Sequence, residues 1–552
     1  MSKFNSALLV TWLLIGTCPL SRAGSATWKS NAASGDWNTA TNWTPNTVPN
    51  GPGDTATFAV SQHTAISISA NVEVSNIVFG AGASAYTIAP SPGVVLTLSG
   101  PGITNNSGIT QNFVPENNAS GAWGVVSFTN AATAGVGVTF VNPPGIANFS
   151  YGGEIDFSDS ATAGFATFTN SGGTIEFGYG GLIHFSDNAS ADHGTFTSIA
   201  SSAGLAEGGQ IYFRDTSSAG HATFDTKGGV AFQSIGALTW FYESSTAEEA
   251  TMTTEGGAGP GETLFLATST VGNSTQIAAD SPGEDFGGLL RIYNSSTGGT
   301  ARVEVFGNGQ IDTTTRDTGH GKVIIGSLEG DGMAVVRDIN FGGSLIVGSN
   351  NLSTVFAGTI SSGRLGKIGS GALTLTGANG YDGPTIVRGG KLLVNNVAGS
   401  ATGTGLLRVD IGALGGNGII SGPVTIGAGQ ASRALLAPGV SGQGVLTTQN
   451  TLTFGSNGAY NWSFDAGTQT ADEAVSNGVT IDPEAAFSPF GSGTGTLGNG
   501  TVFTAISNTS ANPISGTFSN LPDGGVISVN GNNFQVSYEG GDGNDLTLTV
   551  VP

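Results

Sequence analysis

Two histidines separated by 28 residues, His193 and His221, are the side chains of this sequence best placed for chemistry. Four charged residues accompany them: Asp192, Glu248, Glu249 and Arg214. Imidazoles held beside carboxylates can bind a metal ion or shuttle a proton. At the same spacing, however, the histidine column continues as Phe165 and Glu249, so the repeat does not keep a metal-binding or proton-transferring residue at this position. The sequence therefore favours a variable corner facing solvent.

Acidic side chains recur at the same 28-residue spacing. They are Asp159, Asp187, Asp215 and Glu243. If successive copies stack as neighbouring strands, these carboxylates lie about 4.8 Å apart and repel one another unless they are solvated or share a cation. The sequence favours a solvated corner in which the carboxylates cap turn amides, and bound calcium is the alternative.

A glycine-rich stretch at 540–545, GGDGND, begins like the calcium-binding nonapeptide of parallel β-rolls. Asp542 and Asp545 are therefore weak candidate calcium ligands. The stretch occurs once and its apolar residue comes one place early, so we expect a hairpin between strands at 534–538 and 546–551. We predict no catalytic residue and no cofactor other than this calcium, because the known catalytic and phosphate-binding motifs are absent.

The elements that must position these residues come from an internal repeat. Four sixteen-residue blocks begin at Gly153, Gly181, Gly209 and Ala237, always 28 residues apart. Their bulky apolar residues form two columns, Phe157, Phe185, Phe213, Phe241 and Phe168, Phe196, Phe224, Met252, with a corner of alanines between them at Ala163, Ala191, Ala219 and Ala247. A constant period with alternating apolar residues predicts a stack of β rungs. Phe128 and Phe140 predict a fifth copy with one inserted residue.

Composition agrees with an almost wholly β protein. Glycine accounts for 91 of 552 residues, charged residues make up only 10%, and no long segment has helical periodicity. The formal net charge of −22 argues against nucleic acid or an anionic membrane as a partner, because both need basic surfaces.

The N-terminus reads as a secretion signal at residues 1–23. Lys3 precedes an apolar run at 7–16, and Ser21-Arg22-Ala23 forms a small-x-small cleavage site. Cleavage there removes Cys18, the one cysteine, and no second apolar span follows. We therefore expect export to the extracellular space or the outer cell surface, and no transmembrane segment after cleavage.

Residues 365–394 show a second kind of repeat. Its markers are Lys367, Gly369, Gly371, Leu373, Leu375, Gly377-Ala378-Asn379, Tyr381, Gly383, Thr385 and Gly389-Gly390. This stretch resembles the passenger-associated transport repeat, also called the autotransporter-associated β-strand repeat. The resemblance implies a rung of a right-handed parallel β-helix in a secreted or surface-exposed bacterial protein. It extends more loosely to 326–348 and 413–439, and we expect no translocator domain after Val394.

The expected fold is thus an all-β, elongated right-handed parallel β-helix, or β-solenoid, with capping segments at both ends. The expected parts are 24–120 (N-terminal cap and first rungs), 121–305 (28-residue repeats), 306–450 (rungs with the transport repeat) and 451–552 (C-terminal cap). Trp28, Trp37 and Trp43 can form either a platform for sugars or the plug of the N-terminal cap. The cap is favoured.

These features favour a non-catalytic β-solenoid that acts as an adhesin, matrix or surface scaffold protein. Its partners would be extracellular polysaccharide or other surface proteins. The alternatives are a carbohydrate-active β-helix enzyme, a polysaccharide lyase or hydrolase, and a calcium-stabilised module of a larger secreted assembly.

Overall fold

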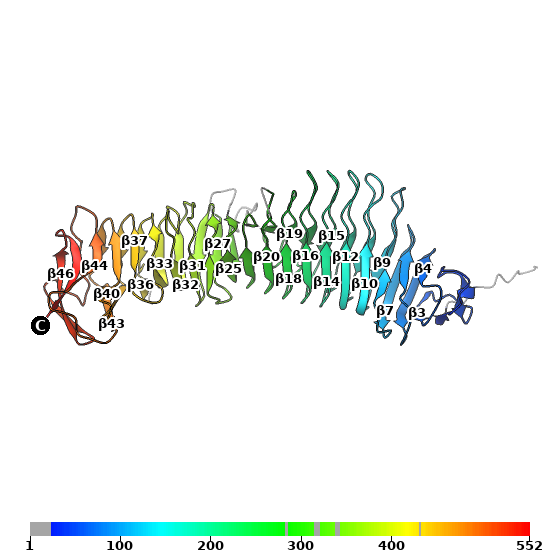
Figure 1. The fold of residues 1–552 in the computed structure, drawn as a ribbon, viewed down its shortest axis with the longest axis horizontal. Helices are drawn as coiled ribbons and strands as arrows, with labels where there is room; N and C mark the ends of the chain where they lie inside the picture. The colour runs from blue at the N-terminus through cyan, green and yellow to red at the C-terminus, as the bar shows by residue number, and fades with distance from the viewer. Residues whose placement is uncertain (1–23, 282–284, 314–320, 337–342, 430–431) are drawn as a thin grey trace, which may run out of the picture.

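The computed structural model describes residues 24–281, 285–313, 321–336, 343–429 and 432–552. The predicted secretion signal at 1–23 lies outside these residues. The described chain is an all-β parallel solenoid of about 17 turns, which confirms the predicted fold class. Its strands run across the long axis of a rod-like molecule (Figure 1). Within the described ranges the helical structure is one 3-10 turn, η1 (Ala40–Asn42), and none of it is long and apolar enough to cross a membrane.

One long sheet contains the first strand of each rung in the N-terminal part of the stack. In spatial order its strands are β2 (Trp43–Thr44), β1 (Ala26–Trp28), β3 (Gly51–Phe58), β5 (Val72–Phe79), β7 (Val95–Asn105), β9 (Val125–Phe128), β11 (Glu154–Phe157), β13 (Leu182–Phe185), β15 (Gln210–Phe213), β17 (Leu238–Phe241), β19 (Glu262–Phe265), β21 (Leu289–Ile292), β23 (Gln310–Asp312), β26 (Met333–Val335) and β29 (Thr359–Ile360). We call it the first sheet.

The second sheet holds the opposing strands and, further along, both strands of the later rungs. Its members are β4 (Ala65–Ile68), β6 (Thr87–Pro90), β8 (Gln111–Phe113), β10 (Val136–Asn142), β12 (Phe165–Asn170), β14 (Thr195–Ser198), β16 (Thr223–Thr226), β18 (Thr251–Thr254), β20 (Thr275–Ala278), β22 (Arg302–Val305), β24 (Lys322–Ile325), β25 (Ser327–Gly330), β27 (Ser344–Val347), β28 (Thr354–Phe356), β30 (Arg364–Lys367), β31 (Ala372–Leu375), β32 (Thr385–Val394), β33 (Leu407–Gly416), β35 (Val424–Ile426), β36 (Ala434–Pro438), β38 (Leu452–Phe454), β39 (Gly458–Asp465), β40 (Thr470–Ala471), β42 (Val479–Ile481) and β43 (Ala486–Ser492).

A third, smaller sheet lies at the C-terminal part of the stack. Its order is β34 (Ile419–Ile420), β37 (Val445–Thr448), β41 (Glu473–Ser476), β44 (Val502–Asn508), β47 (Asp545–Val551), β46 (Asn532–Gly540) and β45 (Val526–Val529). The pairs β44–β47, β46–β47 and β45–β46 are antiparallel, so the parallel stack gives way to a meander here.

The 28-residue repeat sets the register of the stack. Within the repeat, each strand from β11 to β16 pairs in parallel with the strand 28 residues on, so that Phe157 meets Phe185 in the first sheet and Phe168 meets Phe196 in the second. The rings of both pairs stack in parallel, with centroids 4.7 and 4.5 Å apart. All of these rings are buried, and the predicted columns are therefore the core of the solenoid.

The predicted fifth copy is also present. Phe128 pairs with Phe157, and Phe140 pairs with Phe168. The one extra residue lies in β10, where the pairing with β12 slips between Val136 and Thr139. A β-bulge absorbs such an insertion without changing the rungs on either side.

The three N-terminal tryptophans form a plug. Trp28, Trp37 and Trp43 are fully buried. Trp43 packs edge-on against the other two rings, and all three contact Phe58. Trp43 donates its indole N–H to the carbonyl of Trp37 at 2.7 Å. Because these rings are buried, the sugar-platform alternative is wrong for these residues, and their burial agrees with the predicted cap.

Candidate functional site

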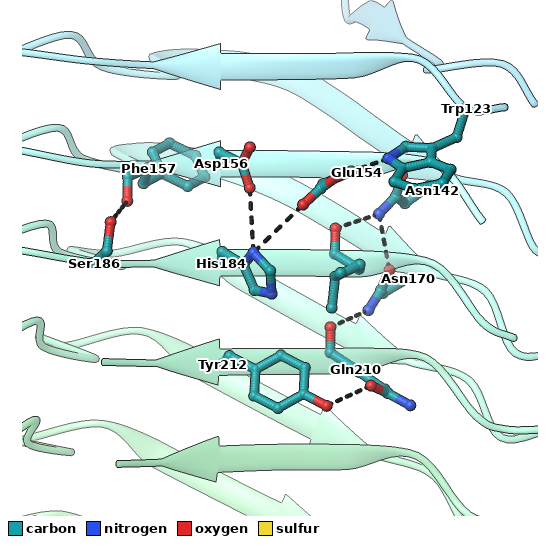
Figure 2. Close-up of polar contacts among 11 residues, drawn as sticks. Trp123, Asn142, Glu154, Asp156, Phe157, Asn170, His184, Ser186, Gln210 and Tyr212 are labelled. Atoms are coloured by element: carbon teal, nitrogen blue, oxygen red, sulfur yellow. Dashed lines mark hydrogen bonds and ion pairs between the residues drawn. The ribbon is translucent and has the colours of Figure 1, made fainter. Parts of the chain in front are cut away.

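A cluster of titratable side chains lies on the outward face of the first sheet, across β11 and β13. Ile155 and Phe157 point into the core, so the alternation of the strand turns Glu154 and Asp156 outward. His184 of β13 pairs in register with Asp156. The parallel stack therefore brings two carboxylates of one rung onto an imidazole of the next (Figure 2).

The imidazole stands between the two carboxylates. His184 Nδ1 lies 3.4 Å from Glu154 Oε1 and 3.4 Å from Asp156 Oδ1. The second oxygen of Glu154 accepts a 2.6 Å hydrogen bond from the indole N–H of Trp123. Asp156 Oδ1 is shielded from solvent and accepts no hydrogen bond within the described structure. Within those residues, these three side chains form the group whose donor atoms all lie within 4.8 Å of one another.

The electrostatics of the cluster follow from this crowding. Burial raises the pKa of the Glu154 carboxyl, and the nearby Asp156 charge raises it further. The Trp123 hydrogen bond and His184 act in the opposite direction. The site therefore holds excess negative charge that attracts a proton or a cation.

Aromatic and polar side chains extend the site along the stack. Tyr212 and Trp240 follow His184 at successive rungs, and the neighbouring rings meet edge to face at 5.4 and 5.2 Å. The Tyr212 hydroxyl donates to Gln210 at 2.5 Å, and the Arg214 guanidinium lies 5.7 Å from the Tyr212 ring centre. Burial, followed by the Glu207 charge, raises the pKa of Tyr212.

Two open cavities flank His184. One, of about 340 Å³, is lined by Ser127, Asp156, Ser158, His184, Phe185, Ser186 and Arg214. The other, of about 290 Å³, lies where the loops meet the sheet, and its walls include the stacked Tyr151 and Tyr179 as well as Glu207, Gln210 and Tyr212. His184 and Arg214 line both cavities, and the two cavities therefore form one polar and aromatic groove on this face.

The loops beside this groove expose apolar tips. Long cyan and green loops rise from one edge of the stack (Figure 1). Phe149 and Phe177 stack at 5.3 Å although both are exposed, and Phe232 is 86% exposed. Backbone hydrogen bonds join neighbouring loops, for example Phe149 N–H to the Phe177 carbonyl at 2.9 Å. The loops are therefore an ordered ridge.

The histidine cluster favoured by spacing lies elsewhere, on a corner. His193 and His221 stack at 5.1 Å, and Phe165 covers the other face of His193. Each imidazole has one carboxylate partner, Asp192 at 2.6 Å and Glu249 at 3.4 Å, and both histidines are about half exposed. Arg214 lines the cavities beside His184 instead. This arrangement agrees with a variable solvent-facing corner.

The acidic column is a hydrogen-bonded ladder. The carboxylates of Asp187, Asp215 and Glu243 accept the backbone N–H of the preceding member of the column at 3.1, 3.0 and 2.8 Å. Asp159 caps Asn130 N–H in the same way. Each member has a positive φ between 54° and 57°, as its tight turn requires. The predicted capping of turn amides is confirmed.

The glycine-rich stretch forms the expected hairpin between β46 and β47. Asp545 Oδ1 accepts the backbone N–H of Asn508 at 2.8 Å, and this bond attaches the turn to β44. Asp542 is exposed at the tip. Calcium binding by Asp542 and Asp545 stays a prediction.

The transport-repeat markers hold rungs together. The buried Lys367 ammonium donates to the carbonyls of Ile368, Gly369 and Gly389. Asn379 bonds to both neighbouring rungs, accepting Ile360 N–H and donating to the Ala401 carbonyl, each at 2.6 Å. Arg388, Gly389 and Gly390 form a bend inside β32, where Gly390 has φ +61°.

The repeat pattern of the sequence gave no indication of the site at His184. Its column reads Ser127, Asp156, His184, Tyr212 and Trp240, a different residue in every rung. Only the register, which places 156 beside 184, could have pointed to it. Trp123, which precedes β9 and reaches Glu154 across one rung, had no comparable signal.

The fold and these contacts define a passenger-like parallel β-solenoid. Residues 365–394 match the family described as Passenger-associated-transport-repeat, as the sequence predicted. The chain is similar to the Adhesin BmaC autotransporter of Brucella suis biovar 1 (strain 1330), with 40% identity over 96 residues, or 16% of this chain and 3% of that protein. It is also similar to the Haemophilus influenzae Hap adhesin, with 8% identity and a TM-score of 0.30 over 90% of this chain and 59% of that one. It thus spans less than two thirds of either relative.

Proposed function

We propose that the protein is a secreted or surface-exposed, non-catalytic adhesin or scaffold that holds an extended polysaccharide in the groove beside His184. One observation carries this proposal: aromatic and hydrogen-bonding side chains repeat along the groove at one-rung spacing. Tyr179 and Tyr212 line the groove and Trp240 lies one rung beyond Tyr212, so their rings offer apolar surface. Glu207, Gln210 and Arg214 offer polar groups. Sugars are bound by this combination of apolar and polar groups.

Further features support an adhesive role. The loop ridge exposes contiguous apolar side chains, which are typical of interaction surfaces. The local similarity to an autotransporter adhesin and the transport repeat suit a protein that works outside the cell.

The test is retention of the chain by insoluble polysaccharides and its retardation in gels that contain soluble ones. We expect Tyr212→Ala to weaken binding roughly five- to thirtyfold, since one well-packed aromatic contact contributes about 1–2 kcal/mol. Phe165→Ala is the control, because Phe165 is an exposed aromatic side chain that lies on the histidine corner, outside the groove. Equal loss in both variants, or no binding across the panel, would count against the proposal.

A carbohydrate-active enzyme is the second candidate, favoured by the pair Glu154 and Asp156. Glycosidases use two carboxyl groups whose pKa values differ, and the pKa of Glu154 is raised beside Asp156. The same assay distinguishes the two candidates, because an enzyme releases reducing or unsaturated ends. Release that disappears in Glu154→Gln would replace the adhesin proposal with this one.

A further inference from the structure

We propose that Glu154, Asp156 and His184 form a zinc-binding site with an open coordination position. The donor set is one imidazole nitrogen and two carboxylate oxygens, supplied by two adjacent rungs. This proposal concerns a metal ion and does not depend on polysaccharide binding.

The spacing of the donor atoms fits a tetrahedral ion. Nδ1 of His184 lies 3.4 Å from each carboxylate oxygen, which is long for a hydrogen bond. In a tetrahedral zinc site with bonds of about 2.1 Å, neighbouring donor atoms lie about 3.4 Å apart. The nitrogen thus already stands at the required separation from both oxygens, and the two oxygens lie within 4.8 Å of each other.

The identity of the donors selects among metals. Calcium and magnesium prefer oxygen ligands alone, whereas zinc accepts imidazole together with carboxylate. Two carboxylates also balance the charge of one divalent ion. The two carboxylate oxygens lie within 4.8 Å of one another, and a cation between them relieves their mutual repulsion.

Two further observations point to a ligand. Asp156 Oδ1, the atom that faces His184, is shielded from water and accepts no hydrogen bond in the described part of the chain. Trp123 donates to the other oxygen of Glu154 at 2.6 Å, and such a bond orients a metal-binding carboxylate. Buried polar oxygens normally have a close donor or ion, and a cation would give Asp156 Oδ1 a closer partner than the imidazole nitrogen at 3.4 Å.

An ion bound here would face the groove. Asp156 and His184 both line the cavity of about 340 Å³, together with three serines and Arg214. The fourth coordination position therefore opens toward this cavity, where water or a ligand oxygen can occupy it.

The first experiment is calorimetric titration of Zn²⁺ into the chelator-stripped chain without an affinity tag. We expect one tight site per chain, weakened at least tenfold by His184→Gln. His193→Gln is the matched control, because His193 pairs with a single carboxylate, and it should leave the tight site intact. Equal binding by wild type and His184→Gln would overturn the proposal, as would the absence of a stoichiometric site, which would leave the cluster as an ion pair.

A spectroscopic measurement tests the geometry. Co²⁺ in a tetrahedral site absorbs strongly in the visible range, and we expect this band in the wild type and its loss in Asp156→Asn. Trp123→Phe should keep the stoichiometry and weaken affinity about tenfold, as for other groups that support a metal ligand. A band that survives Asp156→Asn would contradict the assignment, provided that circular dichroism shows every variant folded.

Discussion

Lys367 shows at the scale of one residue how this protein accommodates a buried charge. The transport repeat places it at the end of β30, where its ammonium group has three carbonyl partners and no carboxylate partner among the contacts described. Burial lowers the pKa of Lys367 to about 8. The sequence identified this lysine as a family marker, but its role appears only when the carbonyls of Gly369 and Gly389 come together across a rung.

We predict that Lys367→Met lowers the free energy of unfolding by about 1–3 kcal/mol at pH 7, because three carbonyls lose their donor. The difference in the free energy of unfolding between the wild type and Lys367→Met should grow between pH 8 and 10.5. In that window the unfolded chain holds the lysine proton while the folded chain has released it, so wild-type stability from this site rises with pH. Denaturant midpoints at pH 7 and pH 9.5 measure both effects.

Lys391→Met is the control for this substitution, since Lys391 belongs to the same repeat but is exposed. We expect it to change stability by no more than about 0.5 kcal/mol at either pH. A Lys367→Met effect that is as small, or that shrinks as the pH rises, would refute the assignment.

At the scale of the element, each strand of the first sheet in the 28-residue repeats is followed by a corner of the same shape, and this corner keeps successive rungs in register. The apolar columns, the alanines of the corner and the acidic column could be predicted from the sequence. These positions repeat, and residues of one type at one spacing indicate the same environment in every rung. The groove side of the same rung was not predictable in this way. Its outward positions are free of packing constraints, so Asp156, His184 and Tyr212 differ in type while occupying one column.

Asp187 offers a test of the acidic ladder. Its carboxylate accepts the N–H of Asp159, and its own φ is +54°. We predict that Asp187→Ala costs about 1–2 kcal/mol, because alanine lacks the acceptor and disfavours this backbone conformation. Asp187→Asn retains an acceptor and tolerates positive φ, so its melting temperature should stay close to the wild-type value.

Thermal melting of the two variants, each compared with wild type, measures the difference. Comparable loss in Asp187→Asn would mean that the column contributes through its negative charge and that capping is secondary.

At the scale of the whole molecule, the solenoid is a sum of nearly equivalent rungs. We predict that deletion of residues 209–236, one full repeat, leaves a folded protein, because Gly208 then joins Ala237 in the same register as Gly236 does now. The two sheets close up by one strand each, β15 and β16. The deletion variant should keep the β-sheet signature in its circular dichroism spectrum and a cooperative transition in its melting curve.

Deletion of residues 209–222, half of the same repeat, is the control. It removes β15 but keeps β16, so the strands beyond it lose their places in the stack. We expect aggregation or loss of the cooperative transition. Equal behaviour of the two deletions would be inconsistent with a register fixed by the 28-residue period.

The direction of the strands has a mechanical consequence. Because every strand lies across the long axis, a load applied between the two ends acts to peel rungs one at a time (Figure 1). A rung of 28 residues adds about 4.8 Å to the length of the stack but releases about 95 Å of extended chain when it opens. A single molecule can thus lengthen many-fold by sacrificing end rungs while the remainder stays intact, which is the behaviour of a tether that yields before it breaks.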